Sequence, residues 1–110
     1  MSPAPVFVLL CTCPDAGSAD AIARVLVEAR LAACVTRIPG AVSTYRWQGQ
    51  VEQAEEVQLL VKTAHAPLQA VVERLRELHP HELPEIVAVQ AADGLPDYLD
   101  WVRAETSEEA

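Results

Sequence analysis

Hydrophobic and polar positions recur with different periods along the chain, and these periods predict its elements. Residues 6–11 form a continuous apolar run that is too short for a helix. It predicts a strand that is covered on both faces, or covered by another protein chain. After Pro14, apolar residues recur at helical spacing, and Asp15 or Ser18 is suited to cap this helix. The helical stripe consists of Ile22, Leu26, Ala29 and Ala33.

The pattern changes to β-type residues between Cys34 and Trp47. Within this stretch, Pro39-Gly40 indicates a bulge or kink. The Gln-Gly-Gln sequence of residues 48–50 predicts a hairpin turn. Residues 56–62 then alternate polar with apolar side chains, which predicts a third strand with one solvated face.

The second half of the chain predicts another helix, strand and helix. Pro67 suits the first turn of a helix whose apolar stripe ends at Leu78. Two prolines keep residues 79–85 extended, and residues 86–89 predict the fourth strand. A short helix presenting Tyr98, Leu99 and Val102 on one side closes the domain, and residues 105–110 are expected to form a frayed acidic tail.

This order of elements predicts one α+β domain over residues 1–110, with residues 1–5 and 105–110 as flexible ends. Strand, helix, two strands, helix and strand make the ferredoxin-like βαββαβ arrangement with an antiparallel sheet, here followed by an extra C-terminal helix. Right-handed crossovers place the first strand between the third and the fourth. The end of the first strand, Cys11 to Cys13, is therefore expected beside residues 79–85.

The predicted hairpin is too long for a domain of this size. A strand from Cys34 to Trp47 spans roughly 45 Å at ~3.3 Å per residue, whereas a compact domain of this length is roughly 35 Å across. Its far part carries Tyr45 and Trp47, and an aromatic hairpin tip is an aggregation hazard unless another chain receives it. A homo-oligomer is expected; the alternative is that Pro39-Gly40 bends the strand back over its own sheet.

Composition and charge narrow the functional classes. An apolar fraction of 51% excludes disorder for most of the chain, and a net charge of −8 without any Lys/Arg cluster disfavours nucleic acid and anionic membranes as partners. The sequence has no run long enough to span a membrane, and its first residues lack the basic region of a signal peptide. Three cysteines make a disulfide staple improbable, so the cytoplasm is the expected location.

Several segments together resemble the CutA family of divalent-cation-tolerance proteins. The likeness runs from about residue 6 to residue 102 and rests on a specific combination of short motifs. These are Leu31-Ala32-Ala33-Cys34-Val35, Ile38-Pro39-Gly40, Ser43-Thr44-Tyr45-Arg46-Trp47-Gln48-Gly49, Glu55-Glu56-Val57, Lys62-Thr63, His79-Pro80, Pro84-Glu85 and Tyr98-Leu99-Asp100-Trp101. The resemblance implies a ferredoxin-like homotrimer, joined through the long hairpin and involved in tolerance of, and response to, copper and other divalent metals.

The resemblance also implies a copper site formed by a Cys at the end of the first strand and a His-His pair before a proline. The Cys falls on Cys11, but the pair falls on Leu78 and His79, so one imidazole is missing. Thr36 and His81 also depart from the residues common in the family, which are Asn and Tyr.

From the residues themselves, this rim offers possible metal ligands, which are Cys11, Cys13, His79, His81, Glu82 and Glu85. The resemblance makes Cys11 and His79 the candidate ligands, with Cys13 and His81 as possible additions. Thiolate and imidazole suit copper(I) or zinc, whereas nearby Glu82 and Glu85 suit harder ions. Strand alternation places both cysteines on one face, but Pro80 separates the two histidines. The alternative is that Cys11 is a small buried apolar residue and the histidines are solvated. No organic cofactor is expected.

A second group, Tyr45, Trp47, Glu56 and Lys62, lies on or near the hairpin. In one interpretation these residues line a pocket between subunits that binds a small anion or metabolite. In the other they pack one subunit against the next and form an ion pair at the interface. The chain has no catalytic motif, and the loop after the first strand lacks the basic group that acylphosphatases of this architecture need. An enzyme is therefore not expected. A metal-tolerance protein and a trimeric signalling or scaffolding module, binding a small ligand or a protein partner at subunit clefts, remain as hypotheses.

Overall fold

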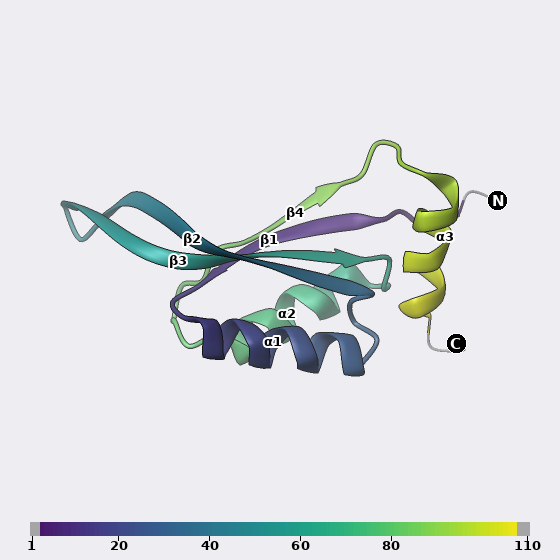
Figure 1. The fold of residues 1–110 in the computed structure, drawn as a ribbon, viewed down its shortest axis with the longest axis horizontal. Coiled ribbons are helices and arrows are strands. Elements are labelled where there is room, and N and C mark those ends of the chain that lie inside the picture. Colours follow the sequence, from purple (N-terminus) through teal and green to yellow (C-terminus); the bar gives the residue numbers. More distant parts are fainter. Residues whose placement is uncertain (1–2, 108–110) are drawn as a thin grey trace.

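The computed structural model describes residues 3–107 and has the predicted α+β architecture (Figure 1). Within these residues the elements are β1 (Phe7–Cys13), α1 (Ala16–Glu28), β2 (Cys34–Trp47), β3 (Gln50–Thr63), α2 (Leu68–Leu78), β4 (Ile86–Gln90) and α3 (Pro96–Glu105). No helix in this described part is both long and apolar enough to cross a membrane.

The four strands form one antiparallel sheet in the order β2-β3-β1-β4, which confirms the predicted position of β1 between β3 and β4. Both α1 and α2 cover the same face of the sheet (Figure 1), and the core lies between them and that face. Leu9 and Leu59 of the sheet, with Leu26 and Leu75 of the helices, are fully buried there. The opposite face carries no helix, and α3 lies beyond the end of the sheet where β1 begins (Figure 1).

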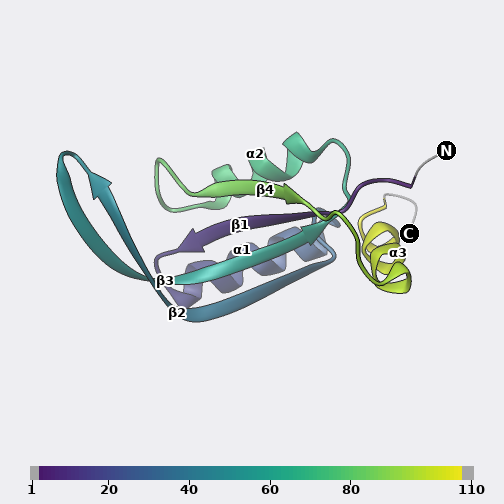
Figure 2. The ribbon, with the colours of Figure 1, turned by 90° about the horizontal axis from the view of Figure 1, so that it is seen from above.

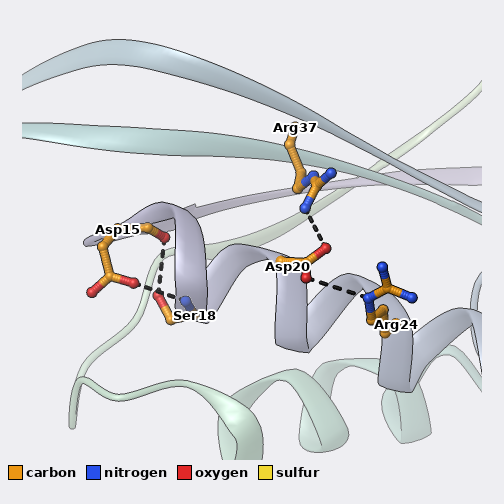
Figure 3. Close-up of polar contacts among 5 residues, drawn as sticks. All are labelled: Asp15, Ser18, Asp20, Arg24 and Arg37. Carbon is orange, nitrogen blue, oxygen red and sulfur yellow. Dashed lines mark hydrogen bonds and ion pairs between the residues drawn. The ribbon is translucent and has the colours of Figure 1, made fainter.

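Helix α1 begins where the sequence predicts. Asp15 is its N-cap and accepts a hydrogen bond from the backbone N–H of Ser18, 2.8 Å away (Figure 3). The carboxylate thereby satisfies one of the first backbone N–H groups of α1, which have no partner inside the helix, and stabilises the start of the helix.

The β2–β3 hairpin projects beyond the rest of the sheet and makes the molecule long, with extents of 49 × 26 × 23 Å. The register between the strands shifts between Ile38 and Ala41, where Gly40 has a φ of +79°, so the predicted bulge is confirmed. Past the bulge the hairpin curves and continues outward instead of folding back over its own sheet (Figure 2). The alternative in which Pro39-Gly40 returns the strand to its own domain is therefore wrong.

Two predicted boundaries are wrong. Helix α1 ends at Glu28, because Arg30 takes a positive φ of 60° and the N–H groups of the next two residues donate back to the carbonyl of Leu26. Ala33 lies outside the helix, and its N–H bonds the carbonyl of Lys62 in the sheet. The predicted tail also starts too early, because Glu105 is still helical; residues 108–110 lie outside the described residues.

Candidate metal centre

The end of β1 and the end of α2 bring three potential metal ligands together. Cys11 and Cys13 alternate along β1 toward the helix-covered face, and both are fully buried. His79 is the C-cap residue of α2 and is also buried. The ligand atoms of these three residues all lie within 4.8 Å of one another. The structure thus joins the two principal candidates and gives Cys13 an equal place beside them.

Two hydrogen bonds fix the orientation of the His79 ring. Its Nε2 donates to the backbone carbonyl of Thr12 over 2.7 Å, and its Nδ1 accepts from the backbone N–H of His81 over 3.0 Å. A ring that accepts at Nδ1 carries its proton on Nε2. The imidazole is therefore held at the cysteines by backbone groups on both sides, one from β1 and one from the loop that follows α2.

The two thiols influence each other's ionisation. A hydrogen bond to Cys13 raises the pKa of Cys11, and burial and the negative charges of Cys13, Glu85 and Glu56 raise it further. The same interaction lowers the pKa of Cys13. A bound cation would take the place of the proton on Cys11, since metals bind the thiolate form.

The donor set fits a soft metal ion. Two sulfurs bound to one zinc ion in a tetrahedral site are about 3.8 Å apart, so atoms within 4.8 Å of one another need only a small contraction. Two thiolates and an imidazole suit copper(I) or zinc and are poor ligands for magnesium or calcium. Burial of all three residues would keep water away from such an ion.

Two other positions considered from the sequence lie outside this cluster. His81 is exposed, and its ring centre is 5.1 Å from that of His79. Leu78 is the last residue of α2 and packs against the hydrophobic core. The position at which the resemblance implies a first histidine therefore carries an apolar side chain, and the third ligand atom of the cluster comes from Cys13.

A cavity of about 780 Å³ lies beside the cluster. It is lined by Thr12, Ser43, Tyr45, Trp47, Glu56 and residues 80–85. Thr12 belongs to both features, because its carbonyl holds His79 while the residue also lines the cavity. The sequence indicated neither Thr12 nor Ser43 as site residues, although strand alternation could have placed Ser43 on the same face as Tyr45.

Lys62 does not join the other three residues of the predicted second group. It lies six positions from Glu56 along β3, roughly 20 Å away at the usual rise of a strand. Its Nζ donates to Thr36 Oγ1 over 2.6 Å and lies 3.9 Å from the sulfur of Cys34. Within one chain, the predicted group therefore separates into a cavity containing Tyr45, Trp47 and Glu56 and a distant lysine.

The family pattern described as "CutA1 divalent ion tolerance protein" matches residues 7–105. The divalent-cation tolerance protein CutA of Thermus thermophilus is 50% identical over 99 residues, which are 90% of this chain and 96% of that protein. The crystal structure of CutA from Xylella fastidiosa is 55% identical with a TM-score of 0.90 and covers 93% of this chain and 98% of its own.

A third match is the structure described as the periplasmic divalent cation tolerance protein CutA from Archaeoglobus fulgidus. It is 31% identical with a TM-score of 0.88, and the match covers 93% of this chain and 99% of that one. Sequence pattern, relatives and fold agree over nearly the whole chain. The chain therefore belongs to the CutA1 divalent ion tolerance family.

Proposed function

We propose that this protein contributes to divalent-cation tolerance by binding copper or zinc at Cys11, Cys13 and His79. The observation that carries the proposal is the convergence of two thiols and one imidazole, all buried, with ligand atoms within 4.8 Å of one another. The role is one of binding rather than catalysis, in keeping with relatives that are named tolerance proteins.

Metal binding would change the contacts of the loop that follows α2. A neutral imidazole that ligates through one nitrogen carries its proton on the other. If Nδ1 binds the metal, it stops accepting from the N–H of His81; if Nε2 binds, the proton moves to Nδ1, with the same result. In either case the hydrogen bond from the His81 N–H is lost. The rest of the site remains fixed by β1, which holds both sulfurs.

The test is a competition titration of copper(I) and zinc on the reduced protein. We expect one metal ion per chain, and at least tenfold weaker binding in each of Cys11→Ser, Cys13→Ser and His79→Ala because each change removes one ligand. Cys34→Ser is the matched control, since Cys34 is a half-buried thiol outside the cluster. Binding unchanged in all three variants, or lost in the control, would contradict the proposal.

We further propose that the protein is a homotrimer in the cytoplasm. The hairpin projects past its own domain, and the sheet face without helices exposes Ile38, Val87 and Val89, each about half accessible. Such apolar exposure is typical of a surface that packs against other chains. A reducing compartment also keeps Cys11 and Cys13 available as ligands. Fractionation of cells that express the protein tests its location.

A further inference from the structure

The segment that connects β4 to α3, residues 91–95, contains an aspartate followed by a glycine. Asp93 and Gly94 belong to no helix or strand, and both are exposed. Figure 1 shows this connection at the end of the molecule opposite the hairpin. The N–H of Ala91 still donates to the carbonyl of Val6, but among the described residues no backbone hydrogen bond of this kind holds the two residues that follow Ala92. The Asp-Gly pair therefore has freedom to change its local conformation.

The carboxyl group of Asp93 lies on the amide of the next residue. Its Oδ1 accepts a hydrogen bond from the Gly94 N–H over 2.8 Å. Adding one carbon–oxygen bond of ~1.23 Å places the Gly94 nitrogen at most about 4 Å from Cγ of Asp93. A small side-chain rotation suffices to reach the ~3–3.5 Å at which two atoms can react. In the described range 3–107 no Lys, Arg or His forms an ion pair with Asp93 that would hold its carboxyl group elsewhere.

Asp93 differs from the other aspartates in the residue that follows it and in its backbone. Glycine has no Cβ, so the approach of its nitrogen to a neighbouring carbon is not blocked by a side chain. The sequence contains no other Asp-Gly pair and no asparagine. The remaining aspartates cap a helix or lie within one, where helical geometry holds the backbone; they are Asp15, Asp20, Asp97 and Asp100.

We propose that Asp93-Gly94 is a modification site at which the aspartate isomerises to isoaspartate. The Gly94 nitrogen forms a bond to Cγ of Asp93, while the bond from Cγ to the hydroxyl of the protonated carboxyl group breaks. The hydroxyl and the amide proton leave as one water molecule, and a cyclic succinimide results. Water then adds to the α-carbonyl carbon and breaks its bond to nitrogen, so the main chain afterwards runs through the former side chain. One water leaves and one enters, and no oxidant or reductant is needed.

The isomerised residue would disturb the contact between this connection and α3. Gly94 packs closely on the helix, since a Cβ built at Gly94 would lie 3.2 Å from Cδ2 of Leu99. Isoaspartate adds one carbon to the main chain directly before this contact. It also presents a new α-carboxylate, which is the group that isoaspartyl carboxyl methyltransferases methylate with S-adenosylmethionine. The partner that fits this site is therefore an enzyme of that class.

The test follows isoaspartate in the assembled protein during prolonged incubation at neutral pH. Trypsin cleavage after Arg76 and Arg103 leaves Asp93, Asp97 and Asp100 on one peptide, in which electron-transfer fragmentation locates isoaspartate. We expect Asp93 to isomerise within about tenfold of its rate in the chain unfolded in guanidinium, because the folded loop keeps the reacting atoms close. In the folded protein we expect at least about tenfold slower reaction at the two helical aspartates.

Two variants locate the reaction. Asp93→Glu keeps the negative charge but lengthens the side chain, so the strained larger ring disfavours cyclisation and we expect no isomerisation at this position. Asp97→Glu makes the same change on α3 and is expected to leave the reaction at Asp93 unchanged. Incubated parent protein should also accept methyl groups from S-adenosylmethionine and an isoaspartyl methyltransferase, one per isomerised chain, and this labelling should disappear in Asp93→Glu.

Either of two outcomes would overturn the proposal. Isomerisation of Asp93 more than about tenfold slower in the folded protein than in guanidinium would show that the fold or the assembly protects the loop. Equal rates at Asp93 and Asp97 in the folded protein would show that the glycine and the hydrogen bond to its N–H create no preferred site.

Discussion

At the scale of single residues, backbone hydrogen bonds orient one of the potential metal ligands. His79 is positioned by Thr12 and His81, and the sulfurs of Cys11 and Cys13 lie within 4.8 Å of one of its ring nitrogens. Motif comparison implies a metal position at Cys11 and a histidine pair, strand alternation adds Cys13 as a possible ligand, and the structure brings Cys13 into one cluster with Cys11 and His79. Leu78 stands at the position where the resemblance implies a histidine, and the structure packs its side chain against the core.

Asp20 provides a pH prediction at this scale. Figure 3 shows its carboxylate between Arg24 and Arg37; the hydrogen bond from Arg24 lowers its pKa, and the charges of both arginines lower it further. A lowered folded-state pKa stabilises the protein above the ordinary carboxyl pKa, and this contribution is lost as the pH falls through the lowered value.

We therefore expect Asp20→Asn to lower the urea midpoint modestly at pH 7, and the difference to shrink as the pH falls through the lowered pKa of Asp20. The measurement is the urea midpoint of both proteins as a function of pH. Because the ion pairs are solvent-exposed, 1 M salt is expected to shrink the difference at pH 7. A difference that grows on acidification would contradict this assignment.

At the scale of elements, the amphipathic faces, the start of α1 and the end of α2 were predictable, but the end of α1 was not. The bounds of β2, Cys34–Trp47, follow directly from its β-type residues and the turn after it. The end of α1 was placed too late because the apolar period continues through Ala29 and Ala33, while the left-handed residue that ends the helix is Arg30 rather than a glycine. Such a conformation results from backbone hydrogen bonds to Leu26, which no residue type indicates.

Helix α2 provides the stability prediction at this scale. Leu75 is fully buried between the helix and the sheet, so Leu75→Ala removes apolar contacts and leaves a cavity. We expect a loss of about 2–5 kcal/mol in the free energy of unfolding, measured by urea denaturation at fixed protein concentration. The control is Leu83→Ala, because Leu83 is 74% exposed and its truncation is expected to cost about 0.5 kcal/mol or less. Equal losses in the two variants would contradict this description of the core.

At the scale of the whole molecule, the strand-length argument correctly indicated a hairpin that leaves its domain, since it needs only the rise per residue. The residues that line the cavity could not be predicted in the same way. The lining depends on residues 80–85 meeting the hairpin, and even the nearest lining residues of the two segments, Glu56 and Pro80, are 24 positions apart in the sequence.

Assembly gives the prediction at this scale. Ile38 is 45% exposed on the helix-free face of the sheet, and Val27 is 42% exposed on α1. We expect the parent protein to have three times the 11.9 kDa mass of one chain and Ile38→Glu to dissociate it, because an unpaired charge in an apolar interface is costly. Val27→Glu, with the same charge at a similarly exposed position, is expected to remain assembled. Light scattering after size exclusion measures both masses, and dissociation of the Val27 variant alone would refute this choice of face.

The hydrogen bond between the His81 N–H and Nδ1 of His79 has a thermodynamic consequence. The residue that gives up this bond when His79 ligates a metal also lines the cavity. Metal binding at His79 must then change the free energy of the loop that follows α2, and linkage requires that whatever holds this loop in one arrangement change the metal affinity by the same factor. The loop would thereby report on the occupancy of a site that is itself buried.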